Sequence, residues 1–197
     1  MRNGLSPDLI ARVLGAAPKY TLAELEEKFP PRNLPDGAFV TRFAPSPTGY
    51  MHLGGLYQAL IDCKLAYDTG GVFMLRIEDT DTKREVADAV KIIQDSMQRF
   101  GLAYNDVPEY GPYYQSQRRD IYHSVVADLL ARGLAYPCFL TAAEMERIRE
   151  NQKAAGFATG IYGEFARDRD ITDDEIVRRL DAGEVPSIRL YSTGNPE

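Results

Sequence analysis

Hydrophobic residues follow two patterns along the first part of the chain, one typical of buried strands and one typical of helices. Apolar residues form short runs at 39–44 and 72–77, which predict strands. Apolar residues recur every three or four positions over about 54–68 and again over 82–100, which predicts helices. The resulting β-α-β-α order predicts right-handed crossovers and an α/β fold with a doubly wound parallel sheet. Ligands of such sheets bind at the carboxyl ends of the strands.

The pattern changes beyond residue 112, where a long amphipathic helix is followed by a short strand. Ser/Thr-x-x-Glu boxes mark two helix starts, because each hydroxyl and each carboxylate can bond the free amides of a first turn. The predicted elements are a helix at 116–132, a strand at 134–139, helices that begin after Thr141 and Thr172, and a strand that begins at 188. This order is typical of an α+β unit.

Composition and charge place limits on the function. A length of 197 residues suits one ordinary domain and part of a second. The net charge of −6 does not indicate a nucleic-acid binder, so RNA binding would need a local basic surface. Cys63 and Cys138 are the only cysteines, which favours free thiols in a reducing compartment. Because no apolar run approaches the length of a membrane span, we expect a cytoplasmic protein without membrane contact.

The segment 42–55, RFAPSPTGYMHLGG, carries the clearest chemical pattern of the chain. It joins the first predicted strand to the first predicted helix, and Pro45 and Pro47 stiffen the connection. His52 stands next to the predicted helix start, where its imidazole could donate a hydrogen bond to a phosphate. A stiff glycine-bearing loop before a helix N-terminus is typical of anion-binding sites. The glycines are Gly49, Gly54 and Gly55.

The string APSPTGYMHLGG resembles the first signature, the "HIGH" motif, of class I aminoacyl-tRNA synthetases, in the form found in bacterial glutamyl-tRNA synthetases. Two further blocks fit that family in the same order, LRIEDTD at 75–81 and GPYYQSQRRDIY at 111–122, which leads to GLAYPCF at 133–139. The resemblance runs from about residue 39 to the C-terminus. A proline-glycine loop with a capping histidine would explain each piece separately, but it would not explain the joint pattern.

The resemblance implies a doubly wound, Rossmann-like domain and a two-step reaction. Glutamate attacks the α-phosphate of ATP, which enters with Mg²⁺, and a ribose hydroxyl of tRNA(Glu) then attacks the glutamyl-adenylate. The substrates supply both nucleophiles, so the protein positions groups and stabilises charge. The implied catalytic residues are His52, Gly54 and Gly55, and Thr48 joins them in the ATP site. In this chain Gly55 replaces the final histidine of the signature.

The same resemblance implies a glutamate site. Arg42 would hold the side-chain carboxylate and Glu78 the ammonium, assisted by Ser46 and the carbonyl of Ala44. The alternative for Arg42 and Glu78 is a salt bridge between neighbouring strand ends. Contacts to tRNA are implied more weakly for Tyr114, Arg118 and Arg119, since charged residues on a helix surface are usually only solvated.

No metal site is expected. Some relatives bind zinc with a Cys-x-Cys pair and a Tyr-x-x-x-Cys element, but here Leu140 follows Cys138 at that spacing, and Ala166 follows Tyr162. One thiolate cannot build a tetrahedral zinc site. The acidic pair Asp79 and Asp81 is explained as well by turn caps as by a metal.

The resemblance implies three parts. Residues 1–38 form a helical extension and connector, 39–112 the first half of the nucleotide-binding domain, and 113–197 part of an inserted domain that binds the tRNA acceptor stem. The extension is either a docking or tRNA-contacting arm or, as we favour, a helical pair packed against the catalytic domain. The chain contains no Lys-Met-Ser-Lys-Ser-like string. We therefore expect a truncated N-terminal part of a monomeric enzyme, inactive in isolation.

Two alternatives remain for the function. One is the paralogue that glutamylates the queuosine base of tRNA(Asp), which shares the APSP-type and IED-type motifs. The N-terminal extension and the missing zinc ligands argue against it. The other is a non-catalytic module that keeps the nucleotide cleft and binds nucleotide or tRNA.

Overall fold

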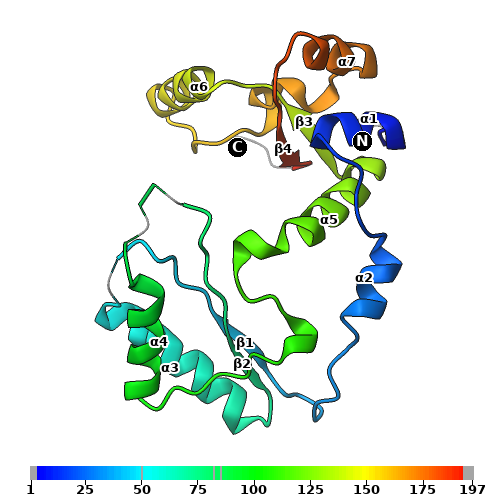
Figure 1. The fold of residues 1–197 in the computed structure, drawn as a ribbon. Coiled ribbons are helices and arrows are strands. Elements are labelled where there is room, and N and C mark those ends of the chain that lie inside the picture. Colours follow the sequence, from blue (N-terminus) through cyan, green and yellow to red (C-terminus); the bar gives the residue numbers. More distant parts are fainter. Residues whose placement is uncertain (1–3, 50, 82, 85, 193–197) are drawn as a thin grey trace. The chain divides into compact units, whose positions relative to one another are not determined.

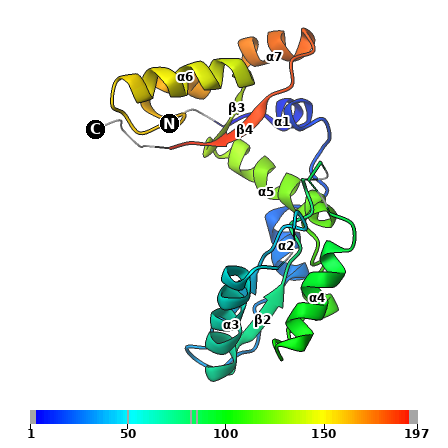
Figure 2. The same ribbon diagram turned by 90° about the vertical axis from the view of Figure 1, so that its left-hand side faces the viewer.

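The chain consists of two compact units, which Figures 1 and 2 show as ribbons coloured along the sequence. One unit is the segment 23–120, and the other joins the N-terminal segment up to residue 22 with the segment from 121 onward. The structure, a computed structural model, describes residues 4–49, 51–81, 83–84 and 86–192. The domain borders predicted at 38 and 112 stay predictions.

The unit 23–120 is built on a parallel strand pair. Strand β1 (Val40–Phe43) pairs with β2 (Val72–Leu75) in the register Val40 to Val72 through Phe43 to Leu75. Helix α3 (Leu53–Asp68) connects the two strands, and α4 (Ala89–Arg99) follows β2. Figure 1 shows α3 and α4 on one side of the strand pair. The predicted β-α-β-α order and the α/β fold class are confirmed.

The hydrophobic core of this unit lies between the strand pair and the two helices. Residues of β2 are apolar along nearly the whole strand, and three of its four residues are buried. In β1 only Phe43 is buried, because successive side chains of a strand point to opposite faces. The buried members of this core are Phe43, Ala59, Cys63, Ala66, Phe73, Leu75, Ile77, Ile93, Met97 and Leu102.

Helix α4 is shorter than predicted. The apolar pattern predicted a helix over 82–100, but the helix begins only at Ala89. Its N-cap residue Asp88 has a φ of 62°, a left-handed conformation that interrupts a right-handed helix. The amide of Val86 donates to the carbonyl of Pro47 at 2.9 Å. This segment therefore bonds to the loop after β1 instead of forming a helical turn. Thr82 lies outside the described residues.

The remaining elements of this unit are short. Helix α2 spans Leu22–Lys28, and one-turn 3₁₀ helices lie at Pro108–Tyr110 (η1) and Gln115–Arg118 (η2). The helix predicted at 116–132 is therefore α-helical only as α5, Arg119–Ala131. An isolated parallel bridge between Ile77 and Tyr114 continues the line of the sheet beyond the end of β2.

The other unit contains an antiparallel strand pair, β3 (Ala135–Cys138) with β4 (Ser187–Leu190). Both predicted helix starts are confirmed. Thr141 and Glu144 form a complete capping box at the start of α6 (Ala142–Ala154), and the Thr172 side chain caps α7 (Asp173–Asp181). Two further 3₁₀ turns lie at Gly163–Phe165 (η3) and Arg167–Asp170 (η4).

The first helix, α1 (Pro7–Leu14), packs within this second unit. Its start is capped by Ser6, and the buried residues Leu9, Ile10 and Val13 share a core with residues of α5, β3 and α7. The amide of Leu5 donates to the carbonyl of Leu130 in α5 at 3.1 Å. The expected packing of a helical pair against residues 39–112 is therefore wrong for this helix, because its apolar face lies against residues from 121 onward.

Candidate functional site

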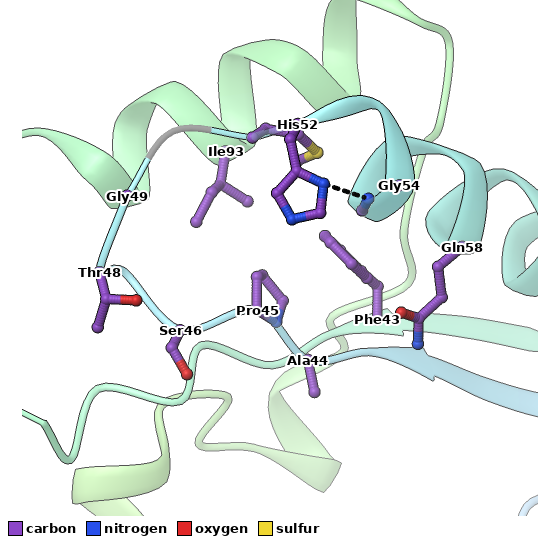
Figure 3. Close-up of a pocket in the computed structure, with 12 residues that line it drawn as sticks. Phe43, Ala44, Pro45, Ser46, Thr48, Gly49, His52, Gly54, Gln58 and Ile93 are labelled. Carbon is purple, nitrogen blue, oxygen red and sulfur yellow. Dashed lines mark hydrogen bonds between the residues drawn. The ribbon is translucent and has the colours of Figure 1, made fainter.

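A cavity of about 490 Å³ lies where β1 ends and α3 begins, within the unit 23–120. Figure 3 shows the loop after β1 on one side of it and His52 on the other. The residues predicted for the ATP site all line this cavity, and so do two of those predicted for glutamate. The lining residues are Phe43, Ala44, Pro45, Ser46, Thr48, Gly49, Met51, His52, Gly54, Gly55, Gln58 and Ile93.

Two hydrogen bonds hold the loop that forms one wall of the cavity. The amide of Glu78 donates to the carbonyl of Pro45 at 3.0 Å, and the amide of Val86 donates to the carbonyl of Pro47 at 2.9 Å. Pro47 itself is fully buried. Proline has a fixed φ and no amide to satisfy, so this pattern gives a stiff loop tied to the segment after β2.

His52 is the N-cap of α3, and its ring is oriented by the helix that it caps. The amide of Gly55 donates to Nδ1 of His52 at 3.2 Å. Because Nδ1 accepts this hydrogen bond, the neutral ring carries its proton on Nε2, which is then a donor. The side chain is exposed and lines the cavity, so Nε2–H is available to a ligand oxygen there.

The first turn of α3 presents amides to the same cavity. The amide of Gly55 is engaged by His52 Nδ1, and that of Leu56 donates to the His52 carbonyl at 3.1 Å. Among the described residues, the amides of Leu53 and Gly54 have no acceptor, which leaves two donors at the positive end of the helix. Such an end attracts a phosphate. The Gly55 amide, predicted to bind ATP, is thus occupied by the histidine.

Gly54 keeps the histidine in place. A Cβ atom added to Gly54 would lie 3.2 Å from both Nδ1 and Cε1 of His52, which is closer than nearly all real contacts. The equivalent Cβ on Gly55 would lie 3.6 Å from Cζ of Phe43, an ordinary contact. A side chain at the first glycine of the pair would therefore displace the imidazole, whereas one at the second would make only an ordinary contact.

The four residues predicted for glutamate are divided between two cavities. Ala44 and Ser46 line the first one, whereas Arg42 lies one position before Phe43 in β1 and faces the opposite side of the sheet. There Arg42 lines a second cavity of about 200 Å³. Glu78 lies between the two, because its amide bonds to the loop of the first cavity and its carboxylate bonds to a residue of the second.

The alternative of a salt bridge between Arg42 and Glu78 is wrong. Glu78 pairs instead with Arg76, whose Nη2 lies 2.6 Å from its Oε1. The two side chains project from the same face of the chain after β2, since they are two positions apart. Arg42 interacts electrostatically with Asp62 of α3. Burial raises the pKa of the Asp62 carboxyl group, and the positive charge of Arg42 lowers it in part.

The second cavity contains residues that the sequence did not single out. It is lined by Phe29, Arg32, Arg42, Met74, Arg76, Tyr110, Tyr113 and Arg118. Arg76 stands in the LRIEDTD block, where its spacing to Glu78 is a signal that could have been used. Nothing in the local sequence around Arg32 indicates that it would line the same cavity as Arg42.

The three residues predicted to contact tRNA differ in how exposed their side chains are. Tyr114 is partly buried against the core, and Arg118 donates to the carbonyl of Pro112 at 2.8 Å while lining the second cavity. Arg119 is exposed at the start of α5. The tRNA contacts stay a prediction, and of the three residues Arg119 has the side chain most available to a phosphate.

The acidic turn after β2 is occupied by hydrogen bonds. Asp79 accepts from the amide of Ser116 at 2.9 Å and from its hydroxyl at 2.6 Å, and Asp81 pairs with Arg84. Across the described residues, no three histidine, cysteine or acidic side chains gather as metal ligands. In that same part of the chain, no helix has the length and apolar character needed to cross a bilayer.

Comparison with known proteins shows where this fold and site recur. A family model for the catalytic domain of class I tRNA synthetases (E and Q) matches residues 38–195. A glutamate–tRNA ligase of Clostridium perfringens strain 13 is 49% identical over 179 residues, which cover 87% of this chain and 33% of that protein. One of Clostridium beijerinckii is 45% identical over 201 residues, covering 98% and 36%.

Solved structures agree with the sequence relatives. A glutamate–tRNA synthetase from Elizabethkingia anophelis matches with a TM-score of 0.67 at 36% identity, over 78% of this chain and 33% of that one. A glutamate tRNA ligase from Elizabethkingia meningosepticum, solved in complex with its amino acid, matches with a TM-score of 0.66 at 37% identity, over 77% and 32%. The chain thus spans about a third of the length of the curated relatives that it matches.

Proposed function

The chain belongs to the class I tRNA synthetases for glutamate and glutamine, and on this premise we propose that the protein is a glutamate–tRNA ligase. In the first step a carboxylate oxygen of glutamate attacks the α-phosphate of ATP, giving glutamyl-adenylate and pyrophosphate. In the second step a terminal ribose hydroxyl of tRNA(Glu) attacks the acyl carbon and releases AMP. Relatives with the name glutamate–tRNA ligase at 45–49% identity support this choice of amino acid.

The observation that carries the proposal is the set of donors at the first cavity. His52 offers Nε2–H there, and the first turn of α3 offers the open amide of Gly54. These donors are fixed in position, which suits the stabilisation of negative charge on a transferred phosphate. The cavity volume of about 490 Å³ lies in the range of about 300–1,000 Å³ typical of small-molecule sites. Thr48 and Gly55 belong to the same proposed ATP site.

The amino-acid site follows from the position of Glu78 between the two cavities. We assign the ammonium of glutamate to the Glu78 carboxylate, which has oxygen lone pairs left beside its bond to Arg76. Ser46 and the carbonyl of Ala44, which line the first cavity, assist Glu78 in holding this ammonium. The α-carboxylate is then directed into the first cavity, where it can attack ATP. The side-chain carboxylate points into the second cavity toward Arg42. Magnesium would enter with ATP and be held mainly through phosphate and water oxygens.

The partners and setting belong to the same proposal. The tRNA acceptor end would meet Arg119, together with Arg118 and Tyr114 where they remain accessible. Two buried free cysteines among the described residues agree with a reducing cytoplasm. A monomer is part of the same proposal.

Charging of an unmodified tRNA(Glu) transcript with radioactive glutamate tests the function, using the protein at the length that its coding sequence specifies. A transcript contains no queuosine, so a product labelled at its 3′ end supports the ligase and contradicts the queuosine-modifying alternative. No charging of the transcript, with labelling of queuosine-containing tRNA(Asp), would favour that alternative. Binding of ATP or tRNA without any labelling would favour the non-catalytic module.

Substitution of Arg42 tests the site assignment. Arg42→Ala should raise the KM for glutamate by at least about tenfold, equivalent to about 1.4 kcal/mol, because the charge pair with the side-chain carboxylate is lost. The KM for ATP should stay within about twofold. Arg42→Lys should recover only part of the loss, since an ammonium lacks the planar two-donor fork. Equal losses for ATP and glutamate would contradict the assignment.

A further inference from the structure

The second cavity contains residues from outside the part of the chain that the catalytic-domain family model matches. Phe29 and Arg32 come from the connector between α2 and β1, whereas the match to that model begins at residue 38. Both residues lie in the same compact unit as Arg42. The connector therefore supplies part of the wall of the pocket to which the side-chain carboxylate of glutamate was assigned.

Arg32 is held in this wall by contacts that orient its charge without neutralising it. Its guanidinium lies 3.6 Å from the centroid of the Tyr110 ring, and Nη2 lies 3.5 Å from the sulfur of Met74. Aromatic faces and thioethers are weak partners for a cation compared with a carboxylate. Met74 is paired in register with Arg42, so Arg32 reaches the residue directly beside it. The two guanidiniums thus belong to one pocket.

The cavity has an excess of positive charge. Four arginines line it, and the one ion pair among them in the described residues joins Arg76 to Glu78. Asp62 offsets part of the charge of Arg42. Arg32 and Arg118 form no ion pair within the described part of the chain.

Two of the arginines that line this cavity also have an unused donor. The Nε atoms of Arg76 and Arg118 are buried and have no acceptor among the described residues. A buried donor without an acceptor is costly, and an anionic ligand supplies acceptors. The volume of about 200 Å³ is smaller than that of a drug-sized site and suits a short acidic side chain.

We propose that Arg32 of the connector is a specificity-determining residue that favours the anionic side chain of glutamate over the neutral side chain of glutamine. The proposal rests on the proposed function, since it concerns the same amino-acid pocket. Arg42 supplies the direct fork, and Arg32 raises the positive potential of the pocket, which stabilises a carboxylate but not an amide. The N-terminal connector is thereby part of the recognition of the amino acid.

The test compares two stable adenylate analogues in which a sulfamoyl group replaces the phosphate, one carrying glutamate and one carrying glutamine. Their dissociation constants are measured by calorimetry, with the protein at the length that its coding sequence specifies. The variants are Arg32→Ala, Arg32→Lys and Arg42→Ala. Arg99→Ala is the matched control, because Arg99 is an exposed arginine of the same unit and lines neither cavity.

Arg32→Ala should reduce the preference for the glutamyl analogue by about tenfold, mainly by weakening that analogue, while the glutaminyl analogue changes by less than about twofold. Arg32→Lys should recover most of the preference, because it keeps the charge. The control Arg99→Ala should match the wild type. Equal weakening of both analogues by Arg32→Ala, or an equal loss in Arg32→Lys, would show that Arg32 only supports the fold at Tyr110, and would overturn the inference.

Failure of the proposed function gives a different result. If the wild type does not prefer the glutamyl analogue, or does not bind it, the assignment of glutamate fails as a whole. If Arg42→Ala removes the preference and Arg32→Ala leaves it intact, the ligase assignment stands and the role of the connector is refuted.

Discussion

Replacing Gly54 by alanine should weaken ATP binding at the N-terminus of α3 while changing the free energy of unfolding only slightly. The added Cβ would lie 3.2 Å from two atoms of the His52 ring, so the imidazole must move by a few tenths of an ångström. That movement weakens the bond from the Gly55 amide to Nδ1, which orients the ring at present. Alanine at the same time improves the intrinsic helix propensity of the position.

The gain in helix propensity and the weakening of the His52 cap have opposite effects on the free energy of unfolding, whereas only the second effect changes ATP binding. Exchanging glycine for alanine within a helix stabilises it by about 0.5–1 kcal/mol. Weakening the cap costs about 0.5–2 kcal/mol. The free energy of unfolding should therefore change by less than about 1.5 kcal/mol. A hydrogen bond from His52 to a phosphate would be charge-assisted and worth about 1.5–3 kcal/mol, so its loss weakens ATP binding by about ten- to 150-fold.

The assay measures ATP affinity by calorimetry and unfolding by denaturant for Gly54→Ala, Gly55→Ala and His52→Ala. Gly55→Ala gains the same helix propensity, but its Cβ meets Phe43 at 3.6 Å, so it should lose less ATP affinity than Gly54→Ala. NMR of ring nitrogens reports the His52 tautomer directly, since the chain has 2 histidines. ATP affinity and tautomer that are unchanged in Gly54→Ala would refute the role given to the glycine.

Three further predictions concern the second unit and metals. Gln152 is fully buried and forms hydrogen bonds with both the amide and the carbonyl of Gly160. Gln152→Leu should lower the free energy of unfolding by about 1–3 kcal/mol in denaturant unfolding, because these two polar groups lose their partner. A change below about 0.5 kcal/mol would contradict this. Hydrogen bonds from the Thr141 amide, then from Arg167, lower the pKa of Glu144 from 4.5 to about 2, so its contribution to stability is complete above pH 4.5 and is lost as the pH falls toward 2. Glu144→Gln should accordingly lower the unfolding free energy more at pH 7 than at pH 3, and equal losses at both would refute the linkage. The purified protein should contain no stoichiometric zinc by metal analysis, and its Tm should not change with a chelator.

Local patterns in the sequence predict the elements that position the first cavity. Proline and glycine around His52 predict a stiff loop and a helix start, and the structure has both, with the histidine as the cap. The apolar runs predict the strand pair, because a buried strand needs little more than continuous apolar character. Residues near in sequence therefore suffice to bring His52, Ser46 and Thr48 to one cavity.

Contacts between distant segments are the part that the sequence did not predict. The helix expected from 82 begins at Ala89 because Val86 bonds to Pro47, a partner almost forty positions away that no periodicity reveals. The pairing of Glu78 with Arg76 in place of Arg42 depends on which face each strand end presents. The presence of Arg32 and Arg42 in one cavity depends on the path of the connector, which has no repeating pattern.

The two bonds from the segment after β2 to the proline carbonyls also have a consequence for the order in which ligands bind. Pro45 lines the first cavity, Pro47 lies between its lining residues Ser46 and Thr48, and Glu78 belongs to the proposed amino-acid site. The loop therefore cannot move away from the segment after β2 without breaking these hydrogen bonds. A ligand that reduces motion in the loop reduces motion at Glu78 as well. The second ligand then loses less conformational entropy when it binds, which couples the two affinities positively and reciprocally. Amide hydrogen exchange at Glu78 and Val86 reports this coupling, because both amides are released only when the loop opens.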